Sequence, residues 1–236
     1  EKEVVYRDVS FSYNDRDSAD DGQSNPYSTI QSATQASALD HVSFVIPKGK
    51  VVALVGPSGA GKTTAVDLLP RFYDPTDGCI TIDDTDIRNL KIDDLRRLFS
   101  MVTQDSILFN DTVANNIAFG NVSASRDDIR NAARLAYADE FIVDLPDGYD
   151  TLVGERGVKL SGGQRCRLQI ALTLAVDAEI LILDEPTAML DPQGRREVVD
   201  TVYSLCRAKG MTVVYITHHM DECIDADRLI VMSDGR

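Results

Sequence analysis

A glycine-rich octapeptide between a strand pattern and a helix pattern constrains this chain more than any other segment. It reads Gly56-Pro57-Ser58-Gly59-Ala60-Gly61-Lys62-Thr63 and follows the apolar run 51–55. Glycine lets the backbone curl so that several N–H groups point at one place, and the following helix presents its positive N-terminal end there. The segment therefore predicts a phosphate-binding loop. The alternative, a glycine-rich turn without a ligand, fits eight matching positions poorly.

Two side chains of this loop carry the chemistry of nucleotide binding. Lys62 can reach the β- and γ-phosphates of a nucleotide, and the Thr63 hydroxyl can hold Mg²⁺. The predicted nucleotide-binding residues of the segment are Gly56, Ser58, Gly59, Gly61, Lys62, Thr63 and Thr64.

The segment Leu160-Ser161-Gly162-Gly163-Gln164 indicates what the phosphate-binding loop serves. Ser161 as a cap and the two glycines would expose N–H groups before a helix from Gln164 to Ala175. This pentapeptide is the signature of ATP-binding-cassette ATPases, and from about Val4 to Arg236 the chain resembles the nucleotide-binding domain of an ABC transporter. The resemblance implies that residues 161–164 close on the γ-phosphate of an ATP held by another subunit. Taken alone, the pentapeptide also fits a plain helix cap.

A continuous apolar run ends in two carboxylates, Asp184 and Glu185. The run 180–184 fits a strand that is buried on both faces and carries its acids at the carboxyl edge of a sheet. Asp184 would bind Mg²⁺, directly or through water. Glu185 would be the general base or water-orienting residue for attack on the γ-phosphate. Without the phosphate-binding loop, two ordinary acids at a strand end would be the default interpretation.

Four further positions match the family residue by residue. Gln104 resembles the glutamine that contacts Mg²⁺ and the attacking water and senses the transmembrane partner. His218, rather than the adjacent His219, resembles the histidine that donates a hydrogen bond to the γ-phosphate and orients the water. Tyr13 matches the aromatic residue that stacks on adenine, although a tyrosine at a strand end is more often packing. Asp191 matches the residue that crosses the dimer interface.

The resemblance implies an α/β fold in which a P-loop NTPase (RecA-like) core sheet carries an antiparallel β subdomain and an inserted α-helical subdomain. We expect residues 1–236 to form one domain, with the helical part at about 105–175. Strand patterns at Val4–Tyr13 and Leu39–Pro47 fit the antiparallel sheet. The polar stretch 14–38 lacks the apolar surface that would offset its ordering entropy, so we predict a mobile insertion beside Tyr13.

Within the helical part, residues 127–141 show the periodicity of one amphipathic helix. The residues predicted to be buried along this helix are Ile129, Ala133, Ala136 and Tyr137.

Charge and cysteine content bound the partners of the chain. A formal net charge of −14 repels a phosphate backbone, which disfavours nucleic acid. The four cysteines show no CxxC spacing, so neither a metal site nor a disulfide framework is indicated. No apolar stretch approaches the roughly 20 residues that span a bilayer. We therefore expect a soluble domain, excised from a protein whose membrane part holds it at the cytoplasmic side.

The two ends of the chain resemble different transporters. Ser106–Ile117 and Thr151–Gly157 are similar to exporters, and Glu155 would contact the coupling helices of the transmembrane domains. After Gly163 the chain is more similar to an energy-coupling-factor or other importer ATPase, as in Ala188–Val198 and Asp221–Met232. We interpret the chain as a mosaic, natural or engineered.

Three functions are compatible with these sequence motifs. The first is the ATP-hydrolysing module of an ABC transporter, in which two ATP molecules are sandwiched between two cassettes. The second is a nucleotide-gated clamp of DNA repair or translation, which would carry basic surfaces and long insertions. The third is an engineered or divergent domain that binds ATP with little turnover.

Overall fold

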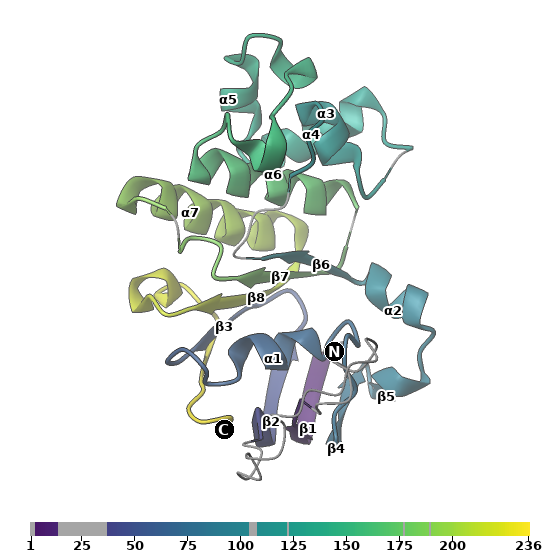
Figure 1. The fold of residues 1–236 in the computed structure, drawn as a ribbon. Helices are drawn as coiled ribbons and strands as arrows, with labels where there is room; N and C mark the ends of the chain where they lie inside the picture. Colours follow the sequence, from purple (N-terminus) through teal and green to yellow (C-terminus); the bar gives the residue numbers. More distant parts are fainter. Residues whose placement is uncertain (1–2, 14–36, 104–107, 122, 177, 189) are drawn as a thin grey trace, which may run out of the picture.

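The computed structural model describes residues 3–13, 37–103, 108–121, 123–176, 178–188 and 190–236. Gln104 and nearly all of the predicted insertion 14–38 lie outside these ranges. Figure 1 shows three regions stacked along the molecule: an antiparallel sheet at one end, a parallel sheet in the middle and a group of helices at the other end. The chain enters the helical region from one strand of the parallel sheet and returns to the next.

The antiparallel sheet has the strand order β2-β1-β4-β5. Its strands are β1 (Glu3–Phe11), β2 (Leu39–Pro47), β4 (Asp77–Ile82) and β5 (Thr85–Asp86). Buried and exposed side chains alternate along β2, as expected when one face covers a core. The Tyr6 hydroxyl donates to the Ala65 carbonyl oxygen at 2.7 Å and so joins this sheet to α1 (Lys62–Asp67). Both strands predicted from residues 4–13 and 39–47 are present.

The parallel sheet has the strand order β6-β7-β8-β3-β9, and every neighbouring pair is parallel. Its strands are β3 (Val51–Val55), β6 (Phe99–Val102), β7 (Ile180–Asp184), β8 (Thr212–Thr217) and β9 (Arg228–Val231). The carboxyl ends of β3, β7 and β8 meet at one edge. Because ligands bind at the carboxyl edge of open α/β sheets, this topology brings the predicted site residues together from distant parts of the sequence.

Helices cover the parallel sheet and build the far end of the molecule. They are α2 (Ile92–Arg97), α3 (Val113–Ala118), α4 (Arg126–Leu135), α5 (Asp139–Val143), α6 (Gly162–Ala175) and α7 (Pro192–Lys209). Short 3₁₀ turns occur at η2 (Ile87–Asn89), η3 (Gly148–Asp150), η4 (Glu155–Gly157) and η5 (Met220–Cys223). A hydrophobic core runs from β7 and β8 through α7 and α6 to α3 and α4, so the helical end shares its core with the sheet.

The prediction of one helix over 127–141 is wrong. The α4 helix ends at Leu135 and α5 begins at Asp139, with Tyr137 at a φ of 51° between them. Backbone bonds from Ala138 N to Ala133 O and from Tyr137 N to Arg134 O form a Schellman cap. Glycine usually takes the left-handed position of this cap, so tyrosine there gave no stop signal. Ile129, Ala133 and Ala136 are buried as predicted, but Tyr137 is 45% exposed.

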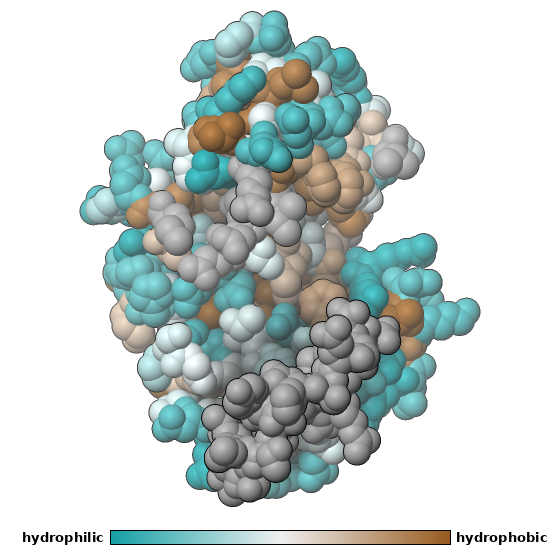
Figure 2. All heavy atoms as spheres, viewed as in Figure 1, coloured by the Kyte–Doolittle hydropathy of each residue, from teal (hydrophilic) through white to brown (hydrophobic). Residues whose placement is uncertain are grey.

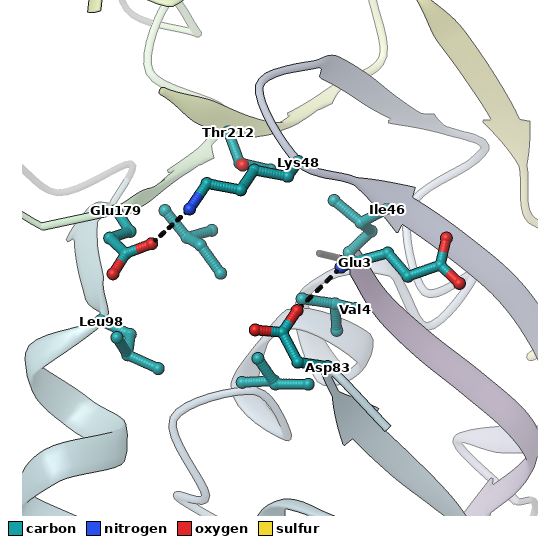
Figure 3. A pocket seen from close by; sticks show the side chains of 10 residues that line it. Glu3, Val4, Ile46, Lys48, Asp83, Leu98, Glu179 and Thr212 are labelled. Atoms are coloured by element: carbon teal, nitrogen blue, oxygen red, sulfur yellow. Dashed lines mark hydrogen bonds and ion pairs between the residues drawn. The ribbon is translucent and has the colours of Figure 1, made fainter. Parts of the chain in front are cut away.

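A small crevice separates the antiparallel sheet from the amino-terminal ends of the parallel strands (Figure 3). Two polar contacts flank it, from Lys48 Nζ to Glu179 Oε2 at 3.0 Å and from the Glu3 amide to Asp83 Oδ1 at 3.2 Å. Its volume is about 70 Å³, which is too small for a nucleotide. It also lies at the strand ends opposite to the phosphate-binding loop.

Candidate active site

The phosphate-binding loop folds around the ammonium group of Lys62. The Lys62 Nζ donates to the carbonyl oxygens of Gly56 and Pro57, both at 2.9 Å, and the residue is 6% exposed. Gly56 has a φ of 152°, and a Cβ there would lie 2.1 Å from the Met232 carbonyl oxygen. Gly61, at a φ of 91°, caps α1 without a side-chain bond. The loop thus presents backbone N–H groups and a cation at the start of a helix, which is an anion-binding arrangement.

A cavity of about 500 Å³ opens beside this loop at the carboxyl edge of the parallel sheet. Its volume falls in the range of small-molecule sites. Its lining consists of Tyr13, Ala38, Ser58, Gly59, Gly61, Lys62, Thr63, Thr64, Asp184 and Glu185. Residues predicted from separate motifs therefore share one cavity.

The acids at the end of β7 are linked to the loop and to the end of β8. The Thr63 hydroxyl donates to Asp184 Oδ2 at 3.0 Å, and His218 Nδ1 lies 3.5 Å from Glu185 Oε2. Burial raises the pKa of Asp184, against the effect of the Thr63 hydrogen bond, and the charge of Glu185 raises it further. Glu185 has a φ of 48°, and its amide donates to the Ile216 carbonyl oxygen at 3.0 Å. Glu185 and His218 thus face each other beside the cavity.

Tyr13 lies at the rim of this cavity. Its hydroxyl is 3.1 Å from Thr64 Oγ1, and its ring makes edge contacts with Phe11 and Tyr73 at centroid distances of 4.8 and 5.3 Å. The ring is 45% exposed. Packing and ligand stacking, the two roles considered for this tyrosine, are therefore compatible at one position.

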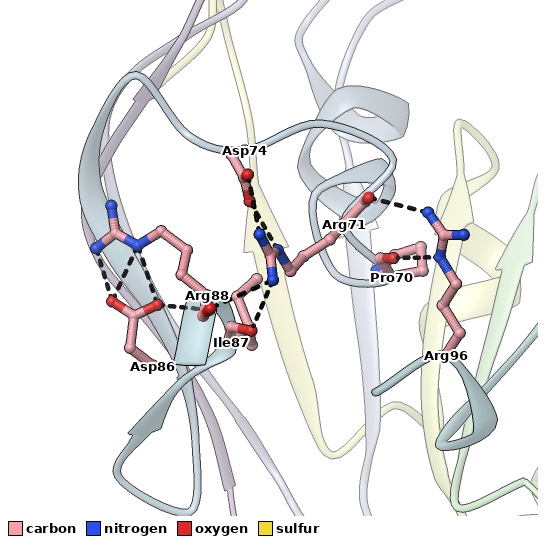
Figure 4. A network of polar contacts seen from close by, with 7 residues as sticks. All are labelled: Pro70, Arg71, Asp74, Asp86, Ile87, Arg88 and Arg96. Atoms are coloured by element: carbon pink, nitrogen blue, oxygen red, sulfur yellow. Dashed lines mark hydrogen bonds and ion pairs between the residues drawn. The ribbon is translucent and has the colours of Figure 1, made fainter. Parts of the chain in front are cut away.

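An arginine network holds the loop that carries Tyr73 (Figure 4). Arg71 makes two parallel bonds to Asp74, at 2.8 and 3.1 Å. Arg96 donates to the carbonyl oxygens of Pro70 and Arg71 at 3.0 and 3.2 Å. The sequence does not predict this network, because its members are spread over separate elements and only the i, i+3 spacing of Arg71 and Asp74 gives a local signal.

The signature segment forms a second surface with the start of α7. Ser161 caps α6 by accepting from the Gln164 amide at 3.2 Å, and Gln164 Oε1 accepts from the Ser161 amide at 2.9 Å. Asp191 caps α7 by accepting from the Gly194 amide at 2.8 Å. A cavity of about 350 Å³ lies between these helix starts, lined by Ser161, Gly162, Gly163, Arg167, Leu190, Asp191, Gln193, Gly194 and Glu197. The signature residues and Asp191 therefore lie together, in a different cavity from Lys62.

With this geometry in place, the match to a family model is decisive. The model of the ABC transporter family matches residues 39–188, which is more than half of the chain. The chain belongs to the ABC transporter family.

Curated relatives of this ABC domain include an ATP-dependent flippase. It is 43% identical over 233 residues to the ATP-dependent lipid A-core flippase of Desulfotalea psychrophila, covering 99% of this chain and 37% of the flippase. It is 48% identical over 198 residues to the heterocyst differentiation ATP-binding protein HepA of Nostoc sp., covering 84% of this chain and 32% of that protein. The chain thus spans about a third of the length of the curated relatives it matches.

A solved structure agrees with this family membership. The structure of a bacterial Atm1-family ABC exporter with ATP bound matches with a TM-score of 0.84 and 39% identity, covering 100% of this chain and 37% of that chain. The predicted α/β fold of a P-loop NTPase is confirmed. The chain is an ATP-hydrolysing nucleotide-binding domain of this family.

Two properties bear on the membrane and on metal ions. In the described part of the chain, none of the helices has the length and apolar character needed to cross a bilayer. Among the same residues, no group of three or more His, Cys, Asp or Glu side chains could hold a metal ion.

Proposed function

We propose that this chain binds Mg²⁺ and ATP and hydrolyses ATP as one half of an ATP sandwich dimer, and so powers an exporter through transmembrane domains. The observation that carries the proposal is the pair of cavities. One cavity is lined by the phosphate-binding loop and the two acids after β7, and the other is lined by the signature and Asp191. Each cavity holds half of the expected site.

The first cavity suits ATP. The loop amides and Lys62 would surround the β- and γ-phosphates, and Tyr13 would stack on adenine at the rim. The hydroxyl of Thr63 and the carboxylate of Asp184, 3.0 Å apart, offer adjacent oxygen atoms. Such hard ligands fit Mg²⁺, which keeps several waters and binds proteins through one or two carboxylates plus substrate phosphates. When bound, Mg²⁺ would neutralise charge that develops on the phosphates.

Hydrolysis would use the residues at the ends of β7 and β8. Glu185 would orient the attacking water and accept its proton, while His218 would donate a hydrogen bond to a γ-phosphate oxygen. The 3.5 Å approach of His218 Nδ1 to Glu185 Oε2 supports their cooperation. From the family resemblance, we also propose that Gln104 contacts Mg²⁺ and the attacking water.

The second cavity would receive the γ-phosphate of ATP held by a second copy of the domain. Ser161, Gly162 and Gly163 begin a helix whose dipole favours an anion there. Asp191, on the same cavity, would cross to the partner. Two copies in this arrangement would complete two ATP sites. The net charge of −14 still disfavours nucleic acid as a partner.

Surfaces suited to the transmembrane domains lie beside these sites. A crevice of about 160 Å³ near β6, the strand that leads to Gln104, is lined by Pro70, Phe72, Arg96, Phe99, Met101 and Ile182. Hydrophobic surface is visible on the helical end (Figure 2). Exposed apolar side chains there include Phe109, Phe119, Val143, Leu152 and Val158. Glu155 is exposed in the same region. We assign these surfaces to coupling helices and place the domain at the cytoplasmic side of the membrane.

We propose residues 1–236 as one ABC domain, with α3–α6 as its inserted helical subdomain. The mosaic hypothesis gains no support from the relatives, because 43% identity to a flippase extends over 233 residues and so includes the importer-like third. One exporter-type cassette is the simpler proposal.

The test of the sandwich is dimerisation that depends on ATP. Glu185→Gln keeps the size of the side chain but removes the proton acceptor, so ATP should bind without being consumed. Because bound ATP favours the closed pair, size-exclusion chromatography should show a dimer with ATP and a monomer with ADP. The control is Glu140→Gln, an exposed acid of α5. A monomeric Glu185→Gln protein at high concentration with ATP bound would exclude the sandwich.

A further inference from the structure

One buried carboxylate lies close to the site without being part of either cavity. Glu222 is 3% exposed and belongs to η5, directly after the histidine pair. Its Oε1 accepts from the Thr187 hydroxyl at 2.7 Å, and its Oε2 accepts from the Thr217 hydroxyl at 2.6 Å and the Tyr215 hydroxyl at 3.1 Å. A buried carboxylate is costly unless it is paired and hydrogen-bonded, so this set of partners is what makes the position tolerable.

The partners of Glu222 come from three segments that the sequence keeps apart. Thr187 follows β7, Thr217 ends β8, and Arg195 of α7 places its Nε 3.3 Å from Glu222 Oε1. The hydroxyl of Tyr203, also in α7, donates to the Glu222 backbone carbonyl oxygen at 3.1 Å. Arg195 lies near the start of α7. The Glu222 side chain therefore contacts the segment after β7, the end of β8 and the start of α7.

The same carboxylate sets the turn that carries His218. The Thr217 hydroxyl donates to Glu222 and at the same time accepts from the His219 amide at 3.0 Å. Its proton is committed to the carboxylate, which leaves an oxygen lone pair for the amide. Burial and the charge of Glu222 raise the pKa of Tyr215, so that phenol also stays a donor. The direction of every bond thus depends on an acceptor at position 222.

We infer that Glu222 is a positioning residue for ATP hydrolysis, which fixes the segments carrying Glu185 and His218 through hydrogen bonds from Thr187 and Thr217. Thr187 lies two residues after Glu185, and Thr217 precedes His218 directly. The inference rests on the proposed roles of Glu185 and His218.

Three conservative variants test this role while keeping the fold. Thr187→Val and Thr217→Val each remove one hydroxyl. Oε1 then keeps the ion pair with Arg195, and Oε2 keeps the hydrogen bond from Tyr215. Glu222→Gln keeps the volume but puts an amide N–H₂ where one threonine hydroxyl donates. The matched control is Glu179→Gln, an acid at the far edge of the sheet whose ion pair with Lys48 is exposed.

Steady-state kinetics should show loss of kcat without loss of binding. Each variant should lower kcat about tenfold with KM for ATP within about twofold, because the misplaced groups act on the reaction and not on the phosphate-binding loop. Adding Glu222→Gln to a Thr187→Val/Thr217→Val double variant should lower kcat no further, since neither linkage is then left to break. A folded Glu222→Gln protein with wild-type kcat, or with KM raised as much as kcat falls, would overturn the inference.

A second readout separates this inference from the proposed function. The chain has three histidines, so their ring resonances can be resolved by NMR. Glu222→Gln should shift the His218 resonances and leave those of His41 unchanged, whether or not ATP is turned over. Unshifted His218 resonances would overturn the positioning role even in an active enzyme. A wild-type chain that binds ATP without hydrolysing it would instead count against the proposed function.

Discussion

The helices α1 and α6 both begin beside a cavity, but their first turns differ. Gly61 begins α1 in a left-handed conformation and offers no side chain to the N–H groups behind it. Ser161 begins α6 with a capping box, in which Gln164 and Ser161 satisfy each other's amides. Lys62 adds a buried cation at the beginning of α1, whereas Arg167 near the beginning of α6 is paired with Glu197.

Because of this difference, we expect the end of α1 to bind a phosphate by itself. We expect the end of α6 only to complete an ATP site on another copy. At α1 the unsatisfied amides and Lys62 can hold a phosphate without help. At α6 the cap has already taken up one amide, so the remaining attraction for an anion is weaker. We therefore expect α1 to determine the affinity for ATP and α6 to determine the assembly of two copies.

Removing the ammonium group of Lys62, at the amino-terminal end of α1, should lower ATPase activity more than any other change. Lys62→Ala should lower ATPase activity more than about a hundredfold and weaken ATP binding, because no other side chain of the loop faces the β- and γ-phosphates with a positive charge. The control is Lys50→Ala, whose lysine pairs with Asp227 on exposed surface. Fluorescence titration with an ATP analogue gives the affinity. Wild-type turnover in Lys62→Ala would remove the site assignment.

Blocking the amino-terminal end of α6 should leave ATP binding intact. Ser161→Arg places bulk and charge where the partner's phosphate-binding loop would dock, so ATPase activity should fall at least about tenfold and the ATP-dependent dimer should disappear. Ser125, which caps α4 with the same kind of capping box, provides the control as Ser125→Arg. Both changes remove one cap, at a cost of about 1 kcal/mol. Light scattering that found a dimer in Ser161→Arg with ATP would break the comparison.

A smaller effect, on the free energy of unfolding, comes from Asp67 in α1. Burial, and then the nearby charge of Asp184, raises the pKa of Asp67 to about 6. The folded chain therefore holds a proton that the unfolded chain releases, and stability falls as pH rises from about 4 to above 6. Asparagine at position 67 has no ionisable group, so the Asp67→Asn protein lacks this loss of stability. Because Asp67 is half-buried and screened by solvent, we expect Asp67→Asn to be stabler by about 1 kcal/mol at pH 7.5.

Thermal unfolding across pH measures this effect. The difference in Tm between Asp67→Asn and wild type should be about 2–4 °C at pH 7.5 and should vanish near pH 4. Asp144→Asn, at an exposed position after α5, is the control. A Tm difference that stays constant with pH would mean that Asp67 does not titrate as described.

Local signals predicted the sheets and the residues of the first cavity, but they did not predict contacts across the fold. Continuous apolar runs such as 51–55 and 180–184 leave few choices other than buried parallel strands, and the loop motif fixes its neighbours. The end of α4 was missed because Tyr137 occupies a position where glycine is the usual marker. Glu222 was missed because its partner Thr187 is 35 residues away, and only the assembled fold brings the two together.

The backbone at Glu185 has an evolutionary consequence. A φ of 48° costs a residue with a Cβ roughly 1 kcal/mol or more, a cost that glycine does not bear. The chain is therefore strained at the residue to which we assign the reaction, and selection for stability alone would replace it. Copies of this gene that no longer need to hydrolyse ATP should drift first at position 185.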